Sequence, residues 1–295
     1  MKHHFGDFLD RTGDYWTTIP NRERFAFIAD FEIANKDEVK ILTISKTQDK
    51  IFWEQIFDCP NLEELTLHDP SKEQVQAIRK LTNIKRLRIT FFRATDIDFI
   101  SDLKNLEELI LEYVSGFSDL TPLTKLTNLK SLHFENLRRV SNFDGLKGIK
   151  SLKYLHIDGT LDWSQPIEDF NFLEGLENLE VLGLGFIVNK TEYPAFLPIL
   201  KLKKFKRLKA GMATLPTKEF AFLEVALSDK ELVNFSNTKL EKYFINKDNW
   251  VYFLGKGTRS INITDKNSKD KIELFEKKYD EYKIEAENII KSYCG

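Results

Sequence analysis

The stretch that decides the fold is Asn105-Leu106-Glu107-Glu108-Leu109-Ile110-Leu111, because the same phrase returns along the chain at a nearly constant interval. Earlier copies occupy residues 61–67 and 83–89. The central leucine recurs in steps of 23, 22, 22, 23, 23, 27 and 26 residues, at Leu42, Leu65, Leu87, Leu109, Leu132, Leu155, Leu182 and Leu208. A leucine pattern with a period in the twenties predicts a solenoid in which each turn contributes one short strand and one return segment.

Within each copy, apolar and polar residues alternate, as they do in a strand with one buried face. Stacked copies would form one parallel sheet whose inward residues make a continuous core. The return segments begin with polar residues and carry apolar residues at helical spacing, so we expect short helices or 3₁₀ turns on the outer face. The predicted inward pairs are Leu42/Ile44, Leu65/Leu67, Leu87/Ile89, Leu109/Leu111, Leu132/Phe134, Leu155/Ile157, Leu182/Leu184 and Leu208/Ala210.

The copy at residues 118–132 resembles the 22-residue repeats of internalins and protein-phosphatase regulators, and the resemblance covers about residues 39–210. It implies an α/β fold, a leucine-rich-repeat solenoid with a curved parallel sheet and short helices or 3₁₀ turns on its convex face. There is one departure from the family pattern. The asparagine expected three residues after the second strand leucine is replaced by Pro70, Phe92, Val114, Leu137, Thr160 and Ile187. The backbone groups of those turns therefore need other partners.

The pattern divides the chain into three parts. Residues 1–38 lack the repeat, contain a possible strand at 24–28 and are interpreted as an N-terminal cap. Residues 39–215 form a solenoid of about eight repeats. Residues 216–295 form a C-terminal cap or a small α+β module, with a hairpin over 250–263 and a helix over about 269–292. Both ends of a solenoid expose apolar residues, so a covering segment is expected at each.

Composition excludes several classes of protein. The 44 basic and 46 acidic residues give a net charge of -2, which provides no global attraction to nucleic acid or to an anionic membrane. No apolar run has the length of a signal peptide or a membrane span. Cys59 and Cys294 are the two cysteines, and their positions do not suggest a disulfide. We therefore expect a cytoplasmic, monomeric protein without a membrane partner.

Residues that alternate with the inward pairs face the concave side of the predicted sheet. Three carboxylates from successive repeats form an acidic ladder there: Glu112, Glu135 and Asp158. His133 and His156 lie beside the ladder, and Arg86 and Arg88 form a basic spot one repeat earlier. Stacked carboxylates repel one another, so the ladder suggests a face that receives a basic partner, with the histidines making it sensitive to pH.

Two other interpretations remain. The set Glu112, His133, Glu135, His156 and Asp158 has the residue types of a zinc or manganese site, so a metal-dependent enzyme is one alternative. An open sheet face lacks the enclosed pocket that metal sites usually occupy, which disfavours it. The run Lys201–Lys209 suggests a nucleic-acid surface, but its apolar residues are core positions of the repeat, so its lysines simply occupy the solvent positions.

No nucleophile is accompanied by a base at a known spacing, and no cofactor motif is present in the sequence. We therefore predict a non-enzymatic scaffold without cofactors whose concave face binds a folded protein, with an inhibitor or immunity-type protein as a special case. Phe91, Tyr113 and Phe186 are the expected aromatic anchors. The full set of predicted contacts is Arg86, Arg88, Phe91, Glu108, Glu112, Tyr113, His133, Glu135, Tyr154, His156, Asp158 and Phe186.

Overall fold

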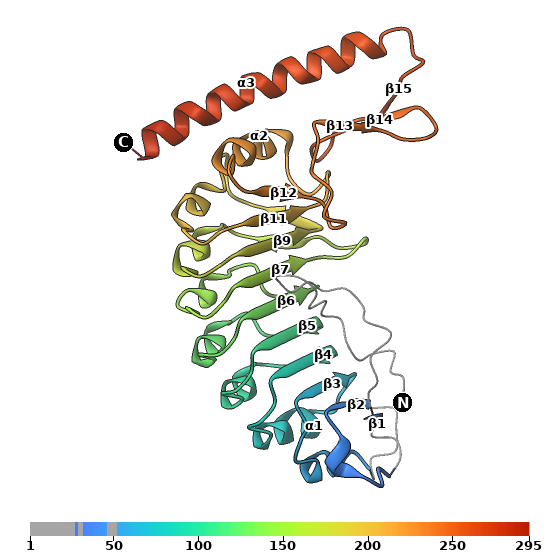
Figure 1. Ribbon diagram of the computed structural model, residues 1–295, viewed down its shortest axis with the longest axis vertical. Helices are drawn as coiled ribbons and strands as arrows, with labels where there is room; N and C mark the ends of the chain where they lie inside the picture. The colour runs from blue at the N-terminus through green and yellow to red at the C-terminus, as the bar shows by residue number, and fades with distance from the viewer. Residues whose placement is uncertain (1–26, 29–31, 46–51, 295) are drawn as a thin grey trace.

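In a computed structural model, the chain is described at residues 27–28, 32–45 and 52–294. Within these residues, strands from successive repeats form a ten-stranded parallel sheet. Figure 1 shows the sheet as a curved stack with short helical turns along one side. In order across the sheet, its strands are β1 (Phe27–Ile28), β2 (Ile41–Ser45), β3 (Glu64–His68), β4 (Arg86–Arg93), β5 (Glu108–Ser115), β6 (Ser131–Glu135), β7 (Tyr154–Asp158), β9 (Val181–Gly185), β11 (Arg207–Ala210) and β12 (Glu231–Val233).

The register of the sheet aligns equivalent positions of the repeats. Leu65 pairs with Leu42 on one side and with Leu87 on the other, and the same correspondence continues to Leu208. None of the predicted inward residues is more than 2% exposed. Burial of one leucine, isoleucine or phenylalanine contributes roughly 1.5–3 kcal/mol, so this aligned column is the main source of stability. The predicted solenoid and its core are confirmed.

The return segments are mostly 3₁₀ turns, as expected for repeats of this length. The exception is α1 (Lys72–Ala77), which begins with a capping box: Ser71 Oγ accepts from the Gln74 amide, and Gln74 Oε1 accepts from the Ser71 amide. Caps of this kind stabilise a helix start by about 1 kcal/mol. The 3₁₀ turns are η1 (Lys36–Glu38), η2 (Trp53–Asp58), η3 (Ile78–Lys80), η4 (Asp98–Asp102), η5 (Thr121–Lys125), η6 (Asp144–Leu146), η7 (Asn171–Gly175) and η8 (Leu197–Lys201).

The two longest repeats contain elements that the leucine period does not predict. Their extra residues form β8 (Gln165–Ile167) and β10 (Ile187–Asn189), which pair in parallel as a separate two-stranded sheet. The 3₁₀ turns η7 and η8 follow these strands. The additional length therefore adds a second layer of pairing beside the main sheet.

The missing asparagine ladder is replaced in two ways. After β6, the fully buried Gln165 accepts from the Leu137 amide at 3.0 Å and donates to the Val140 carbonyl at 2.6 Å. In β4 and β5, the strands continue past the turn position, where Phe92 pairs with Val114 and Arg93 with Ser115. At residues 92, 114 and 137, the backbone groups that an asparagine would satisfy thus pair with a glutamine or belong to a longer ladder.

The ends of the solenoid are built differently. At the N-terminal end, β1 pairs with β2. The rest of the strand expected at 24–28 lies outside the described residues, and so does most of the cap predicted over residues 1–38. At the C-terminal end, α2 (Thr217–Ala226) packs against α3 (Ser268–Cys294), which crosses the end of the stack in Figure 1.

A small antiparallel sheet completes the C-terminal part. The predicted hairpin is present as β14 (Trp250–Phe253) and β15 (Ile261–Asn262), and β13 (Tyr243–Ile245) pairs on the other side of β14. Helix α3 contributes the buried residues Tyr279 and Ala286 to the core, and its Phe275 packs against Phe253 of β14. No helix in the described part of the chain is long and apolar enough to cross a bilayer.

Candidate binding face

The first row of side chains on the concave face is held together by Arg86 of β4. Its Nη1 donates to Glu64 Oε1 at 2.6 Å, and its Nε donates to Glu108 Oε1 at 2.9 Å. The Glu108 side chain is only 1% exposed. The two carboxylates raise the pKa of Arg86 against the opposing effect of its burial. Arg86 is therefore a bridge between three strands.

Arg88, the other half of the predicted basic spot, pairs diagonally with a member of the acidic ladder. Its Nε and Nη2 reach Glu112 Oε2 at 2.8 and 2.6 Å. Burial raises the pKa of Glu112, and Arg88 opposes this shift. Both arginines of the predicted basic spot pair with carboxylates, so the basic spot and the acidic ladder form one network.

The register places Glu112, Glu135 and Asp158 side by side on β5, β6 and β7. Burial, together with repulsion from Glu112 and Asp158, raises the pKa of Glu135 to about 7. The ladder therefore carries less negative charge near neutral pH than its composition suggests: Glu112 is matched by Arg88, and Glu135 is partly protonated.

The two histidines of the middle row are in contact with each other, with ring centroids 4.6 Å apart. Burial lowers the pKa of His133 well below its ordinary value, and His156 and Arg88 lower it further. A His133 that stays neutral does not supply the sensitivity to pH that the sequence suggested. His156 stacks on Phe235 and lies over Gly183, where a Cβ would come within 3.1 Å of its ring.

Three residues have the composition of a metal site. Glu112, His133 and Glu135 each place one possible ligand atom within 4.8 Å of the others. However, Arg88 already donates to the Glu112 oxygen, and a guanidinium at that distance opposes a second cation. The cluster is accounted for by ion pairing within the sheet.

The predicted aromatic anchors lie where the strands turn, and we call Phe91, Tyr113 and Phe186 the aromatic edge. Their side chains are exposed at 52%, 37% and 47%. All three have positive φ angles, of 56°, 54° and 39°. Bulky residues rarely adopt this conformation, which costs of the order of 1–3 kcal/mol per residue. The unusual backbone and the exposed rings together mark the edge as a candidate contact surface.

Part of the aromatic edge borders a hollow of about 390 Å³, which we call the edge hollow. The Phe91 and Tyr113 rings stack there with centroids 4.7 Å apart and planes 15° from parallel. Arg93, Asn136 and Arg138 also line it. Sequence reasoning missed both arginines because they lie beyond the residues predicted to form strands.

The other predicted contacts differ in exposure. Glu108, Glu112, His133 and Tyr154 are buried, whereas Arg86, Arg88, Glu135, His156 and Asp158 have intermediate exposure. The structure thus places eleven of the twelve predicted residues on β4, β5, β6 and β7 of one sheet, and Phe186 directly follows β9. The rings of the aromatic edge are the most exposed among them.

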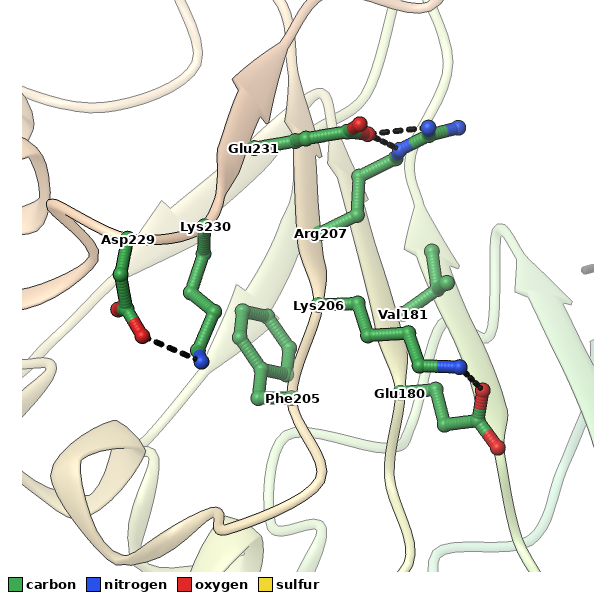
Figure 2. A pocket seen from close by; sticks show the side chains of 8 residues that line it. All are labelled: Glu180, Val181, Phe205, Lys206, Arg207, Asp229, Lys230 and Glu231. Atoms are coloured by element: carbon green, nitrogen blue, oxygen red, sulfur yellow. Dashed lines mark hydrogen bonds and ion pairs between the residues drawn. The ribbon is translucent and has the colours of Figure 1, made fainter.

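The basic run at 201–209 lies among acidic side chains of neighbouring repeats. Lys201 pairs with Glu174 at 2.9 Å, Lys206 with Glu180 at 2.7 Å, and Arg207 with Glu231. Figure 2 shows the last two pairs, with that of Asp229 and Lys230, around a hollow of about 380 Å³. Its lining contains three acidic and three basic residues, so the local charge is balanced.

No protein-family model matches the sequence, and no curated protein matches it either. Solved structures with a similar fold include an internalin from Listeria monocytogenes, at 20% identity and a TM-score of 0.42, covering 60% of this chain and 56% of that one. Internalin C2 of the same organism is 23% identical with a TM-score of 0.41, and the match covers 59% of this chain and 70% of that one. A leucine-rich-repeat protein of Leptospira interrogans is 20% identical with a TM-score of 0.43, and the match covers 68% of this chain and 55% of that one. The chain thus spans little more than half the length of two of these proteins.

The repeat length, the parallel sheet and the 3₁₀ turns define the fold of this protein as a leucine-rich-repeat solenoid.

Proposed function

We propose that the protein is a non-enzymatic scaffold that binds a folded protein partner through its concave face and the aromatic edge. The observation that carries the proposal is the aromatic edge: three large exposed rings, each held in a backbone conformation that a bulky residue rarely adopts. Surfaces that bind proteins are enriched in such aromatic anchors.

The backbone itself does not require these rings. Asn136 has φ 56° at the same position of its repeat, and asparagine tolerates this conformation. Asp69 has φ 45° at this position of an earlier repeat. Rings at 91, 113 and 186 therefore add backbone strain and exposed apolar area that an asparagine would not, which favours a role in contact with another molecule.

The ion pairs on the face support the same function. Arg86 joins β3, β4 and β5, and Arg88 joins β4 and β5. Side chains fixed in this way lose little conformational entropy when a partner binds, so more of the interaction energy is available as affinity.

The proposal is tested by affinity capture from cells that contain the partner. The variant Phe91→Asn/Tyr113→Asn/Phe186→Asn keeps the backbone conformation, because asparagine is the native residue at 136. A matched control, Trp250→Ala/Tyr252→Ala, removes two exposed rings from β14 instead. We expect a protein that is retained by the wild type and the control but lost by the aromatic-edge variant. Equal retention by all three baits would contradict the proposal.

An inhibitor or immunity-type role, in which the acidic ladder covers a basic site on an enzyme, is a narrower form of this proposal. Its charge argument now rests on Asp158 and on Glu135 above pH 7, because Glu112 is matched by Arg88. For a captured enzyme, Asp158→Asn should weaken binding and inhibition together. An unchanged inhibition constant would exclude this role.

A further inference from the structure

The edge hollow combines positive charge with an aromatic surface. Its lining includes the guanidinium groups of Arg93 and Arg138 and the stacked pair Phe91/Tyr113, and it contains no carboxylate. Among the described residues, no ion pair involves either arginine. Arg86 and Arg88 on the same strand as Arg93 are instead committed to glutamates. Among the residues that the structure describes, the lining of the hollow therefore has a net positive charge.

Contacts around Arg138 hold its guanidinium in place. Its Nε donates to Asn136 Oδ1 at 3.3 Å, and its guanidinium carbon lies 5.9 Å from the centroid of the Trp163 ring. Arg93 follows Phe92, which is buried, so the two neighbouring side chains point to opposite sides of the strand. Guanidinium groups recognise carboxylates through paired, charge-assisted hydrogen bonds.

From this arrangement we propose that the edge hollow binds an acidic segment of the protein partner. A carboxylate of the segment is received by Arg93 and Arg138, and a neighbouring apolar side chain packs on the Phe91/Tyr113 stack. This inference rests on the proposed function and adds the chemistry of the partner at one end of the face.

The surrounding charges favour a short acidic segment over a nucleic acid. A polyphosphate chain needs a continuous track of cations. Among the described residues that line the hollow, Arg93 and Arg138 are the two cations, which is too few for such a track. Burial raises the pKa of Tyr113, and the carboxylates of Glu135 and Asp162 raise it further, but neither carboxylate lines the hollow. A local pair of cations beside carboxylates matches a segment with one or two acidic side chains.

The test uses the full chain and a labelled synthetic peptide in which glutamate and phenylalanine alternate. We expect binding by fluorescence anisotropy, and at least a tenfold higher Kd for Arg93→Gln/Arg138→Gln, because this variant removes both charged donors to the carboxylate. The matched control is Arg139→Gln, an exposed neighbour that does not line the hollow, and its Kd should stay within about twofold. The same peptide with glutamine in place of glutamate should bind at least tenfold more weakly.

Several outcomes would overturn the inference. They are no binding of the acidic peptide at millimolar concentration, equal binding by the double variant, or equal binding of the glutamine peptide. Tighter binding of oligothymidylate that depends on the same two arginines would identify a nucleic-acid site instead. Unfolding midpoints of all variants are compared with the wild type, so that a loss of fold is recognised.

The inference and the proposed function fail separately. Peptide binding that ignores Arg93 and Arg138, with partner capture that still needs the aromatic edge, would reject only the inference. Partner capture that does not need the aromatic edge would reject the proposed function, whatever the peptide does.

Discussion

At the scale of single residues, Arg86 stabilises the face by neutralising two carboxylates that are largely removed from water. Arg86→Leu removes this guanidinium and should lower the free energy of unfolding by about 3 kcal/mol, as expected when one partner of a buried ion pair is lost. Urea denaturation provides the measurement. The control is Arg79→Leu, which breaks a half-exposed pair with Asp102 and should cost less than about 1 kcal/mol. Equal costs would show that the Arg86 bridge has no special role.

Glu135 makes stability depend on pH. Its pKa rises from an ordinary value of 4.5 to about 7 on folding, so the folded state binds a proton that the unfolded state has released between these values. Stability from this group is fully present below pH 4.5 and is lost as the pH rises through 7. Relative to Glu135→Gln, the wild type should lose on the order of 1–2 kcal/mol between pH 5 and pH 7.5.

Chemical denaturation of both proteins across this pH range measures the effect of Glu135. Glu63→Gln is a control with the opposite sign, because Lys85 lowers the pKa of Glu63. The contribution of Glu63 to stability is present above its ordinary pKa of 4.5 and is lost only as the pH falls below that value. If the difference in the free energy of unfolding between the wild type and Glu135→Gln stays constant from pH 5 to 7.5, Glu135 is ionised over this whole range.

At the scale of elements, Gln165 performs the task of the missing asparagine ladder after β6. Gln165→Ala removes the acceptor of the Leu137 amide and the donor to the Val140 carbonyl, both in a fully buried place. Buried groups left without a partner cost about 1–3 kcal/mol each, so we expect a loss of roughly 2–4 kcal/mol. Faster hydrogen exchange of the Leu137 amide would locate the effect. Asn128→Ala, which removes an exposed bond to the Lys104 carbonyl, should leave that amide unchanged.

The elements also show how far the sequence could predict the structure. Strands β2 to β7, β9 and β11 followed from the leucine period, because inward residues at fixed spacing determine the register. The short strands β8 and β10 have too few residues to show alternation and were missed. The continuation of β4 and β5 beyond the turn was also missed, since it depends on positive φ angles at Phe91 and Tyr113 that their residue types disfavour.

For the candidate site, the sequence predicted which residues share a row but not which side chains pair. Arg88 reaches Glu112, which lies diagonally across from it, because a long side chain spans more than one row. Burial was equally unpredictable, and it is what raises the pKa of Glu135 and lowers that of His133. The charged residues that the sequence suggested as two patches therefore form one network of ion pairs within the sheet.

At the scale of the whole molecule, we propose that residues 216–295 form a cap that stabilises the solenoid rather than an independent module. Ala286 is fully buried on α3, the helix that packs against α2, so Ala286→Glu places a charge in the core of the C-terminal part. The cap proposal predicts a lower unfolding midpoint and faster hydrogen exchange in β9 and β11. Ile284→Glu, on the same helix but 60% exposed, should change neither. Release of α3 with unchanged exchange in β9 and β11 would instead define a separable module.

The central claim is that the concave face and its aromatic edge bind a folded protein, and a hydrogen-exchange footprint of the captured complex tests it most directly. Backbone amides of the full chain are compared with and without the partner. We predict slower exchange at the ends of β4, β5 and β9, around Phe91, Tyr113 and Phe186. Protection confined to α3 and to strands β13–β15, with these strand ends unchanged, would contradict the account.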